Sequence, residues 1–263
     1  MKKPRIWELD ALRGLAFILM VLDHLTYDLG RVFLYVWFDG PTDHWLYRLC
    51  KLCSDYRDLD IALLLRVLLV SGVFLFVSGI SSNLSRSNLR RGGKLLLISL
   101  GLTAITAVIE IVLDFQGLTI YFGILHCLAL AMLLTPLFLK LNRYVLLALS
   151  LVILVLGTLM ELDVISFSSP FIDTLNRYYL LVPFNIYGNN FSSGDYYPLI
   201  PYMGIYMMGI VIGEKIYYER KSLFSRNLNI KPLNFLGRNA LWLYFVHQIV
   251  LFGLLYAVGW IFF

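Results

Sequence analysis

Long apolar runs alternate with short polar connections along almost the whole chain. Several of these runs are long enough to cross roughly 30 Å of hydrocarbon as an α-helix. The pattern predicts seven transmembrane helices, over residues 8–29, 61–82, 95–113, 118–139, 144–161, 198–216 and 235–260. The last run is long enough for a tilted helix or for a helix with an interfacial start. We therefore expect an all-α fold, a polytopic membrane helix bundle in which residues 1–263 form a single transmembrane domain.

The basic residues of the connections indicate how the bundle is oriented, because cytoplasmic loops carry an excess of Lys and Arg. They gather before the first helix and then in every second connection, at Lys2, Lys3, Arg5, Arg86, Arg90, Arg91, Lys94, Lys140, Arg143, Lys215, Arg220, Lys221, Arg226 and Lys231. This distribution predicts a multi-pass protein of the cell membrane with a cytoplasmic N-terminus. With seven crossings, the C-terminus is expected on the outer side.

Two long connections, 30–60 and 162–197, lie on the outer side in this topology. In 30–60 the basic residues are offset by aspartates, and 162–197 is rich in Tyr, Phe, Asn, Ser and Gly. Long irregular connections are usually functional or disordered, and the aromatic content of 162–197 argues against disorder. We expect this segment to be an interfacial loop that covers part of the protein, or a partly re-entrant segment.

Composition strengthens the membrane assignment. Of the 263 residues 59% are hydrophobic and 15% are charged, and the mean hydropathy is +0.76. Soluble domains are nearer 45–50% apolar and about 25% charged. The net charge of +5 falls mostly in short loops between helices, so it predicts no nucleic-acid partner. Cys50 and Cys53 form a CxxC without a second pair of zinc ligands, and we interpret them as two thiols on a loop helix, with a disulfide or a metal as the alternative.

Ionisable residues inside apolar helices are the strongest functional signal, since each is costly in hydrocarbon. Five of them, from five helices, fall in the outer half of the bilayer: His24, Arg66, Glu110, His126 and His247. Imidazoles suit proton transfer at neutral pH. Other interpretations remain open: Arg66 and Glu110 could snorkel or pair with each other, and His247 could be a packing histidine bonded to a backbone carbonyl.

The first and last helices show a similar arrangement of polar groups. Asp10, Arg13, Phe17, Met20 and His24 follow spacings of three and four and so lie near one helical face. Arg13 and His24 are separated by about 16 Å along the axis. The last helix carries Arg238 and Asn239 near its inner end and Tyr244, His247 and Gln248 further out. Each helix thus offers phosphate-type donors at one end and a base at the other, although Asp10 and Arg13 could equally be a plain i,i+3 pair.

The residues resemble a known family. LDALRGLAFILMVLDH, FLFVSGISSNLSRSNLRRGGK, YFGILHCLALAMLL, SSGDYYPLIPYMGIYMMGIVIGE and FLGRNALWLYFVHQ are similar, in family order, to the heparan-α-glucosaminide N-acetyltransferase catalytic-domain family, among its short prokaryotic members. The resemblance implies a multi-span enzyme that takes acetyl from cytoplasmic acetyl-CoA and delivers it to a sugar amine on the far side. In larger members the positions matching His24 and His126 can be asparagine and glutamine, and a catalytic histidine follows the first helix, where His44 is the nearest candidate.

These observations predict the roles of individual residues. His24, His126 and His44 compete for the role of base, with Asp23 or Glu110 as orienting or charge-balancing partner. The CoA phosphates are expected at Arg13, Arg86, Arg90, Arg238 and Asn239, and the acceptor at Arg66, Asp195, Tyr196, Tyr197 and His247. The expected partners are acetyl-CoA, a carbohydrate or glycan acceptor with an amine or a hydroxyl, and the lipid bilayer. The sequence leaves open whether the chain forms a homo-oligomer.

Two other classes of function fit part of the pattern. A proton-coupled transporter or exporter of a small solute would use midplane histidines as a relay, but the sequence has no inverted repeat and no paired broken helices. A membrane scaffold would bind a partner through its outer loops, but it leaves the convergent ionisable residues unexplained. An acetyltransferase is therefore the function we expect.

Overall fold

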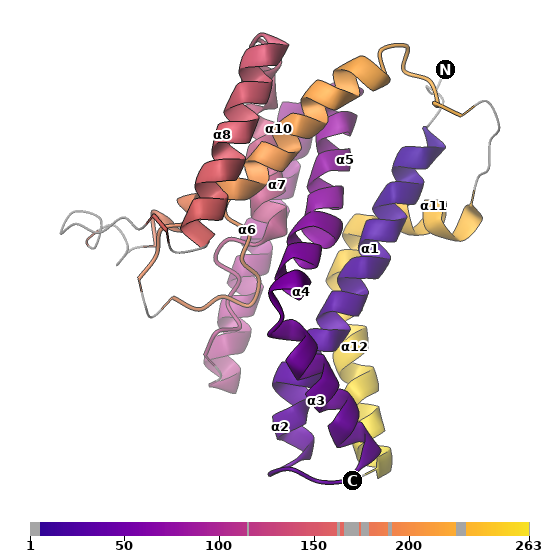
Figure 1. Cartoon of the computed structure of the whole chain (residues 1–263), viewed down its shortest axis with the longest axis vertical. Helices are drawn as coiled ribbons and strands as arrows, with labels where there is room; N and C mark the ends of the chain where they lie inside the picture. The colour runs from indigo at the N-terminus through magenta and orange to yellow at the C-terminus, as the bar shows by residue number, and fades with distance from the viewer. Residues whose placement is uncertain are drawn as a thin grey trace. The chain divides into compact units, whose positions relative to one another are not determined.

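Helices build both of the units into which the chain divides (Figure 1). The computed structural model describes residues 6–114, 116–161, 164–165, 174, 179–188, 191–224 and 230–262. The first unit takes Met1–Phe74 and Lys221–Phe263, and the second takes Leu75–Arg220. Within the described residues no strand is present, and the only extended pairing is an isolated bridge between Phe122 and Tyr196.

The first unit combines the two ends of the chain. Its helices are α1 (Trp7–Tyr27), the π-helical segment η1 (Asp28–Phe33), α2 (Leu34–Trp37), α3 (Trp45–Arg57), α4 (Asp60–Leu65), the π-helical segment η2 (Arg66–Gly72), α11 (Lys231–Arg238) and α12 (Ala240–Phe262). The chain passes from the first unit to the second within α5 (Val73–Ser82).

Backbone contact fixes the crossing of α1 and α11. A Cβ placed on Gly237 would lie 1.8 Å from the carbonyl oxygen of Asp10, and one placed on Gly14 would lie 2.1 Å from that of Leu233. Only hydrogens in place of side chains allow the two helices to approach so closely, which is a common feature of helix packing in membranes. The crossing sets the position of Asp10 and of the residues that follow it on α1.

An apolar cluster holds α3 against the end of the first helix. Phe33, Cys50 and Leu255 are almost fully buried in it, and Phe252 packs around them. Gly30 permits the contact, because a Cβ there would meet the backbone nitrogen of Ser54 at 2.6 Å. The cluster therefore positions α3, and with it the Arg57 side chain at its end.

The second unit is built from helices α6 (Asn88–Leu113), α7 (Ile124–Phe138), α8 (Arg143–Glu161) and α10 (Leu199–Ile216), with the short 3₁₀ turn η3 (Val182–Phe184). Gly79 and Gly209 meet where α5 crosses α10, since a Cβ on Gly209 would lie 2.2 Å from the Phe76 carbonyl oxygen. The Thr135 and Tyr206 hydroxyls form a buried hydrogen bond of 2.7 Å between α7 and α10.

The expectation of an all-helical membrane protein agrees with this architecture. Within the described part of the chain, four helices are long and apolar enough to cross a membrane: residues 88–112, 143–161, 199–216 and 240–262. Seven crossings, a single domain and a cytoplasmic N-terminus stay predictions. Lys2, Lys3, Arg5 and Arg226, which entered the orientation argument, lie outside the described residues, as does much of 162–197.

Several predicted boundaries differ from the structure. The first helical stretch continues beyond residue 29, through η1 and α2 to Trp37. The predicted helix 118–139 begins only at Ile124, because the preceding residues are held in an extended conformation by side-chain hydrogen bonds. The predicted helix 235–260 is two helices, since the chain breaks at Asn239 between α11 and α12. The prediction that placed Arg238 and Asn239 on the last helix was therefore wrong.

Candidate active site

Two imidazoles lie against each other between α1 and α12. The ring centroids of His24 and His247 are 4.8 Å apart, and the rings are nearly perpendicular. The His24 Nδ1 lies 2.9 Å from the carbonyl oxygen of Met20, and the His247 Nδ1 lies 2.6 Å from that of Tyr244. A carbonyl only accepts hydrogen bonds, so both Nδ1 atoms carry the proton in the neutral rings. Each Nε2 therefore has a lone pair.

This pair partly matches the expectations for its members. The bond from His247 to a backbone carbonyl is the one that the packing interpretation foresees. The same bond nevertheless orients the ring toward His24, and Phe17 contacts His247 at a centroid distance of 6.3 Å. Phe17 and His24 thus meet the same residue of α12, as their placement on one face of α1 predicts.

Two buried polar atoms without partners among the described residues lie at the imidazole pair. The His247 Nε2 and the Gln248 Oε1 are buried and make no hydrogen bond with any described residue. Buried polar groups in folded proteins are usually satisfied, so unsatisfied ones call for an explanation. The Gln248 amide nitrogen donates to both carboxylate oxygens of Asp28, at 3.0 Å each. Asp28 is fully buried and lies one helical turn beyond His24.

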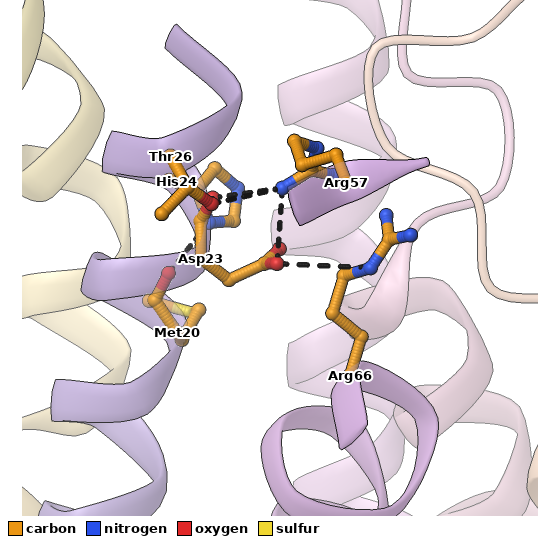
Figure 2. A network of polar contacts seen from close by, with 6 residues as sticks. All are labelled: Met20, Asp23, His24, Thr26, Arg57 and Arg66. Carbon is orange, nitrogen blue, oxygen red and sulfur yellow. Dashed lines mark hydrogen bonds and ion pairs between the residues drawn. The ribbon is translucent and has the colours of Figure 1, made fainter. Parts of the chain in front are cut away.

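A carboxylate next to His24, that of Asp23, lies between two arginines (Figure 2). The Arg57 Nη1 donates to the Asp23 Oδ1 and to the Asp23 carbonyl oxygen, both at 3.0 Å, and to the Thr26 hydroxyl at 3.2 Å. The Arg66 Nε lies 3.8 Å from the same Asp23 Oδ1. Within its own unit Arg66 lies nearest Asp23, and Glu110 accepts from the Thr119 N–H within the other unit. Asp23 binds the two guanidinium groups, and the contact that orients His24 comes from Met20.

The predicted phosphate-binding residues fall into two groups. In the first unit, Asp10 lies 2.9 Å from the Arg13 Nη1 and 3.4 Å from the Arg238 Nε, so this carboxylate brings both guanidinium groups together. The simple i,i+3 pair between Asp10 and Arg13 is therefore present. In the second unit, Arg86 and Arg90 are exposed at the beginning of α6, where Ser87 caps the helix. The remaining member, Asn239, donates to the Phe235 carbonyl oxygen at 2.8 Å.

Burial shifts the pKa values of ionisable side chains in α3, which lies outside the predicted transmembrane helices. Burial lowers the pKa of the Arg57 guanidinium, and the nearby Asp23 carboxylate opposes that shift. Burial also raises the pKa of the Cys50 thiol to about 11, helped by Cys53. The pKa of Cys53 is raised too, again by burial. Both thiols are free and buried, so they form no disulfide, and the described residues contain no group of three or more ligands for a metal ion.

His126 in the second unit has partners at both ring nitrogens. Its Nδ1 accepts from the backbone N–H of Gly123 at 3.2 Å, so the proton of the neutral ring is on Nε2. The Nε2 lies 3.1 Å from the hydroxyl of Thr103, which donates to the Ile120 carbonyl oxygen at 2.6 Å. The ring therefore caps the first turn of α7 and fixes the segment before it. It has no lone pair available for a substrate proton.

Glu110 and Asp195 also bind backbone amides of the second unit. Glu110 Oε2 accepts from the Thr119 N–H at 2.6 Å, and Asp195 Oδ2 accepts from the Ile124 N–H at 3.1 Å. Anionic groups at the beginning of a helix are favourable, which accounts for Asp195 beside α7. Both carboxylates thereby hold the irregular chain on either side of residue 120.

The two predicted acceptor tyrosines belong to the same part of the chain. The Tyr196 hydroxyl donates to the Val182 carbonyl oxygen at 2.8 Å, and its ring contacts Tyr187 and Phe191. Burial raises the pKa of Tyr196. The Tyr197 ring lies against that of Tyr202, with centroids 5.0 Å apart. Both rings are therefore part of the internal packing of the second unit.

The third candidate base, His44, is the N-cap of α3. Its Nδ1 accepts from the Leu46 N–H at 3.2 Å, and its ring stacks on Trp45 and contacts Phe38. The lone pair of this imidazole satisfies a helix terminus, which is a frequent stabilising role for a polar side chain at this position.

Asp28 and Arg57 are the functional candidates that sequence reasoning missed. Asp28 is four residues after His24, so the helical spacing could have placed it on the same face. For Arg57 no such signal exists, because its partner Asp23 is 34 residues earlier and is reached only through the packing of α3.

Four helices of membrane-spanning length among the described residues indicate a membrane protein, and its candidate site contains two imidazoles in contact. Comparison with protein families adds the chemistry: residues 5–249 match the family described as heparan-alpha-glucosaminide N-acetyltransferase, catalytic. Because the match covers most of the 263 residues, the chain belongs to this family, whose members are membrane acetyltransferases. No curated protein and no solved structure matches the chain.

Proposed function

We propose that the protein transfers an acetyl group from cytoplasmic acetyl-CoA to an amine or hydroxyl group of a carbohydrate on the far side of the membrane. The membership in an acetyltransferase family supports the reaction class. The observation that carries the assignment of residues is the contact between His24 and His247, each with its Nδ1 bonded to a carbonyl oxygen.

His24 is the proposed general base. A base must have a lone pair within reach of the acceptor proton. The hydrogen bond from Nδ1 to Met20 leaves the lone pair of His24 on Nε2. The residue is only half-buried, so part of it is accessible to a substrate. The other two candidates use a ring nitrogen to accept a backbone N–H, His126 from Gly123 and His44 from Leu46.

The chemical step then balances as follows. The acceptor nitrogen or oxygen attacks the thioester carbonyl carbon, and its proton passes to the His24 Nε2. A carbon–nitrogen or carbon–oxygen bond forms, the carbon–sulfur bond breaks, and the proton returns to the departing CoA thiolate. His247 is proposed to stabilise the imidazolium form of His24. Its own buried Nε2 is a hydrogen-bond acceptor that has no partner among the described residues.

The nucleotide of CoA is proposed to bind the arginines expected for it from the sequence. Arg13 and Arg238 both lie beside the Asp10 carboxylate, which brings two guanidinium groups together. Arginine suits phosphate because its planar guanidinium donates in a fork. Arg86 and Arg90 are exposed and remain candidates for the same role, with Asn239 as a further polar donor.

Two separate sets of residues are proposed for the acceptor, His247 and Arg66 in the first unit, and Asp195, Tyr196 and Tyr197 in the second. The present contacts of the last three are internal, with Ile124, Val182 and Tyr202. Their proposed role is therefore to shape the segment that receives the acceptor.

The experiment is acetyl transfer or thioester hydrolysis by the purified protein with labelled acetyl-CoA. His24→Ala should lower kcat by about 10²- to 10⁴-fold, the range expected for loss of a general base. His44→Ala is the matched control and should keep its activity per folded molecule. If proteoliposomes move solutes without acetyl-CoA and no label is transferred, the protein is a transporter, an alternative that the comparisons do not support.

A further inference from the structure

We propose that Arg66, supported by Arg57, forms an oxyanion-binding subsite beside His24. This subsite binds a carboxylate, sulfate or phosphate group of one of the two substrates. The inference rests on the proposed acetyl transfer for the identity of those substrates. The subsite itself is defined by the contacts of Asp23, Arg57 and Arg66 (Figure 2).

Two guanidinium groups approach the Asp23 carboxylate, but only Arg57 is hydrogen-bonded to it. The nearby Asp28 accepts hydrogen bonds from Gln248 and interacts with Arg57 through charge alone. Among the described residues, Arg66 therefore has no carboxylate closer than Asp23, 3.8 Å from its Nε. A half-buried charged donor without a hydrogen bond is costly, which makes a ligand with acceptor oxygens favourable there.

The two arginines differ in how firmly they are held. Arg57 donates to three oxygens of Asp23 and Thr26, and its guanidinium lies over the Tyr27 ring, 5.0 Å from the centroid. Arg66 approaches Asp23 only to 3.8 Å, and its buried Nε makes no hydrogen bond with the described residues. The terminal nitrogens of Arg66 point away from Asp23 in Figure 2. Arg57 is thus the fixed support, and Arg66 has donors left for a ligand.

The backbone at Arg66 supplies a second, independent observation. Arg66 is the first residue of the π-helical segment η2, and the other π-helical segment of the unit, η1, begins at Asp28 beside the imidazole pair. π-Helical turns are rare and occur frequently at functional sites. Both of them here begin at ionisable residues of the same polar cluster.

Arginine in this setting selects for oxyanions. Its donors match the spacing of two oxygens on a carboxylate, sulfate or phosphate, and such charge-assisted bonds are the stronger ones. The oxyanion could belong to the acceptor carbohydrate or to the phosphates of the CoA donor. In either position it would anchor a substrate next to His24.

The test uses the full-length protein and four substrate combinations. The donors are acetyl-CoA and S-acetylpantetheine, which has the same thioester without phosphates. The acceptors are glucosamine and glucosamine 6-sulfate. Arg66→Gln should raise KM by about 10- to 100-fold for the substrate that carries the recognised oxyanion, and should leave KM unchanged for the counterpart that lacks the oxyanion. Arg66→Lys should restore part of the loss.

The pattern of KM values identifies the source of the oxyanion. A rise confined to glucosamine 6-sulfate assigns it to the acceptor, and a rise confined to acetyl-CoA assigns it to the donor. Arg48→Gln is the matched control, because Arg48 is an exposed arginine of α3 that pairs with Asp43. An equal change for all four substrates, or no change for any, would overturn the subsite.

A binding measurement separates this proposal from the proposed function. Inorganic sulfate should raise the Tm of the wild-type protein and of Arg48→Gln, and should have little effect on Arg66→Gln. If sulfate stabilises all three proteins equally, the subsite is refuted. If sulfate discriminates but the wild type transfers no acetyl group, the subsite stands and the acetyltransferase proposal fails.

Discussion

His24 and His126 both lie in apolar helices, yet their surroundings differ in one respect that decides what each can do. The His24 Nδ1–H donates a hydrogen bond to the Met20 carbonyl oxygen, and the ring retains a lone pair on Nε2. His126 has the opposite tautomer, with Nδ1 accepting from Gly123 and Nε2 bonded to Thr103. The His24 imidazole keeps a lone pair on Nε2, whereas both ring nitrogens of His126 are bonded to other residues of the protein.

The same contrast extends to the residues around them. Near His24, the His247 Nε2, the Gln248 Oε1 and the Arg66 Nε are buried and unpaired among the described residues. Near His126, the carboxylates of Glu110 and Asp195 both accept backbone N–H groups. Three of the buried polar atoms that lack a partner among the described residues thus lie near His24, whereas the two carboxylates near His126 have backbone partners.

The largest expected effect concerns the helix crossing that positions the polar face of α1. In Gly237→Ala the new Cβ would lie 1.8 Å from the Asp10 carbonyl oxygen, and backbone atoms cannot move aside as a side chain can. We expect a loss of about 3 kcal/mol or more in the free energy of unfolding, measured by denaturant titration in detergent. Gly253→Ala, whose Cβ meets nothing within 4 Å, is the control and should be neutral or stabilising. Equal stability of the two variants contradicts the close crossing.

The next effect tests the imidazole pair. His247→Ala removes the ring that lies against His24, and we expect kcat to fall by about 10²-fold while the protein remains folded. Val246→Ala, at a half-exposed neighbouring position of α12, should keep the wild-type kcat. A wild-type kcat in His247→Ala would mean that the pair is only packing.

A smaller effect is expected for His126, and on a different quantity. His126→Ala leaves the Gly123 N–H without its acceptor, so the free energy of unfolding should fall by about 1–3 kcal/mol. Thermal unfolding measures this loss, and the activity per folded molecule should stay within about threefold of wild type. A large fall in kcat at unchanged stability would reverse the assignment of the two histidines.

The smallest expected effect tests whether the apolar cluster that contains Phe33 and Cys50 is closed to solvent. The pKa of Cys50 is raised to about 11 by burial, so its thiolate, the nucleophilic form, is scarce at pH 9. Alkylation by iodoacetamide at pH 9 should be at least roughly fifty-fold slower in the folded protein than after unfolding. Because the unfolded thiol ionises first, this group adds stability below about pH 9 that is lost as the pH rises toward 11. Rapid alkylation of the folded protein would show an open core.

The sequence predicted the class of fold because hydrophobic length is a local property. Helices over 143–161 and 199–216 lie within about one residue of their predicted boundaries. Errors occur where polar tertiary contacts end or extend a helix, as in the residues before Ile124, which bond to Thr106. The break at Asn239 was not predicted, because the apolar run was interpreted as one helix, tilted or with an interfacial start.

For the candidate site, the sequence predicted shared helical faces better than it predicted contact partners. The spacing on α1 placed Phe17 and His24 on one face, and both contact His247. The partners of Asp23 could not be predicted, because Arg57 reaches it through the packing of α3. The capping role of His126 had a local signal, since a polar residue three positions after an N-cap can bond back to it, as in GILH at Gly123.

The most direct test of the account is the tautomeric state of the histidines, measured by NMR of protein labelled with ¹⁵N in the imidazole rings. Single His→Gln variants assign each pair of signals. The account predicts that His24 and His247 carry the proton on Nδ1 and that His126 carries it on Nε2. Protonation of His24 on Nε2, with the lone pair on Nδ1, would contradict its role as the base.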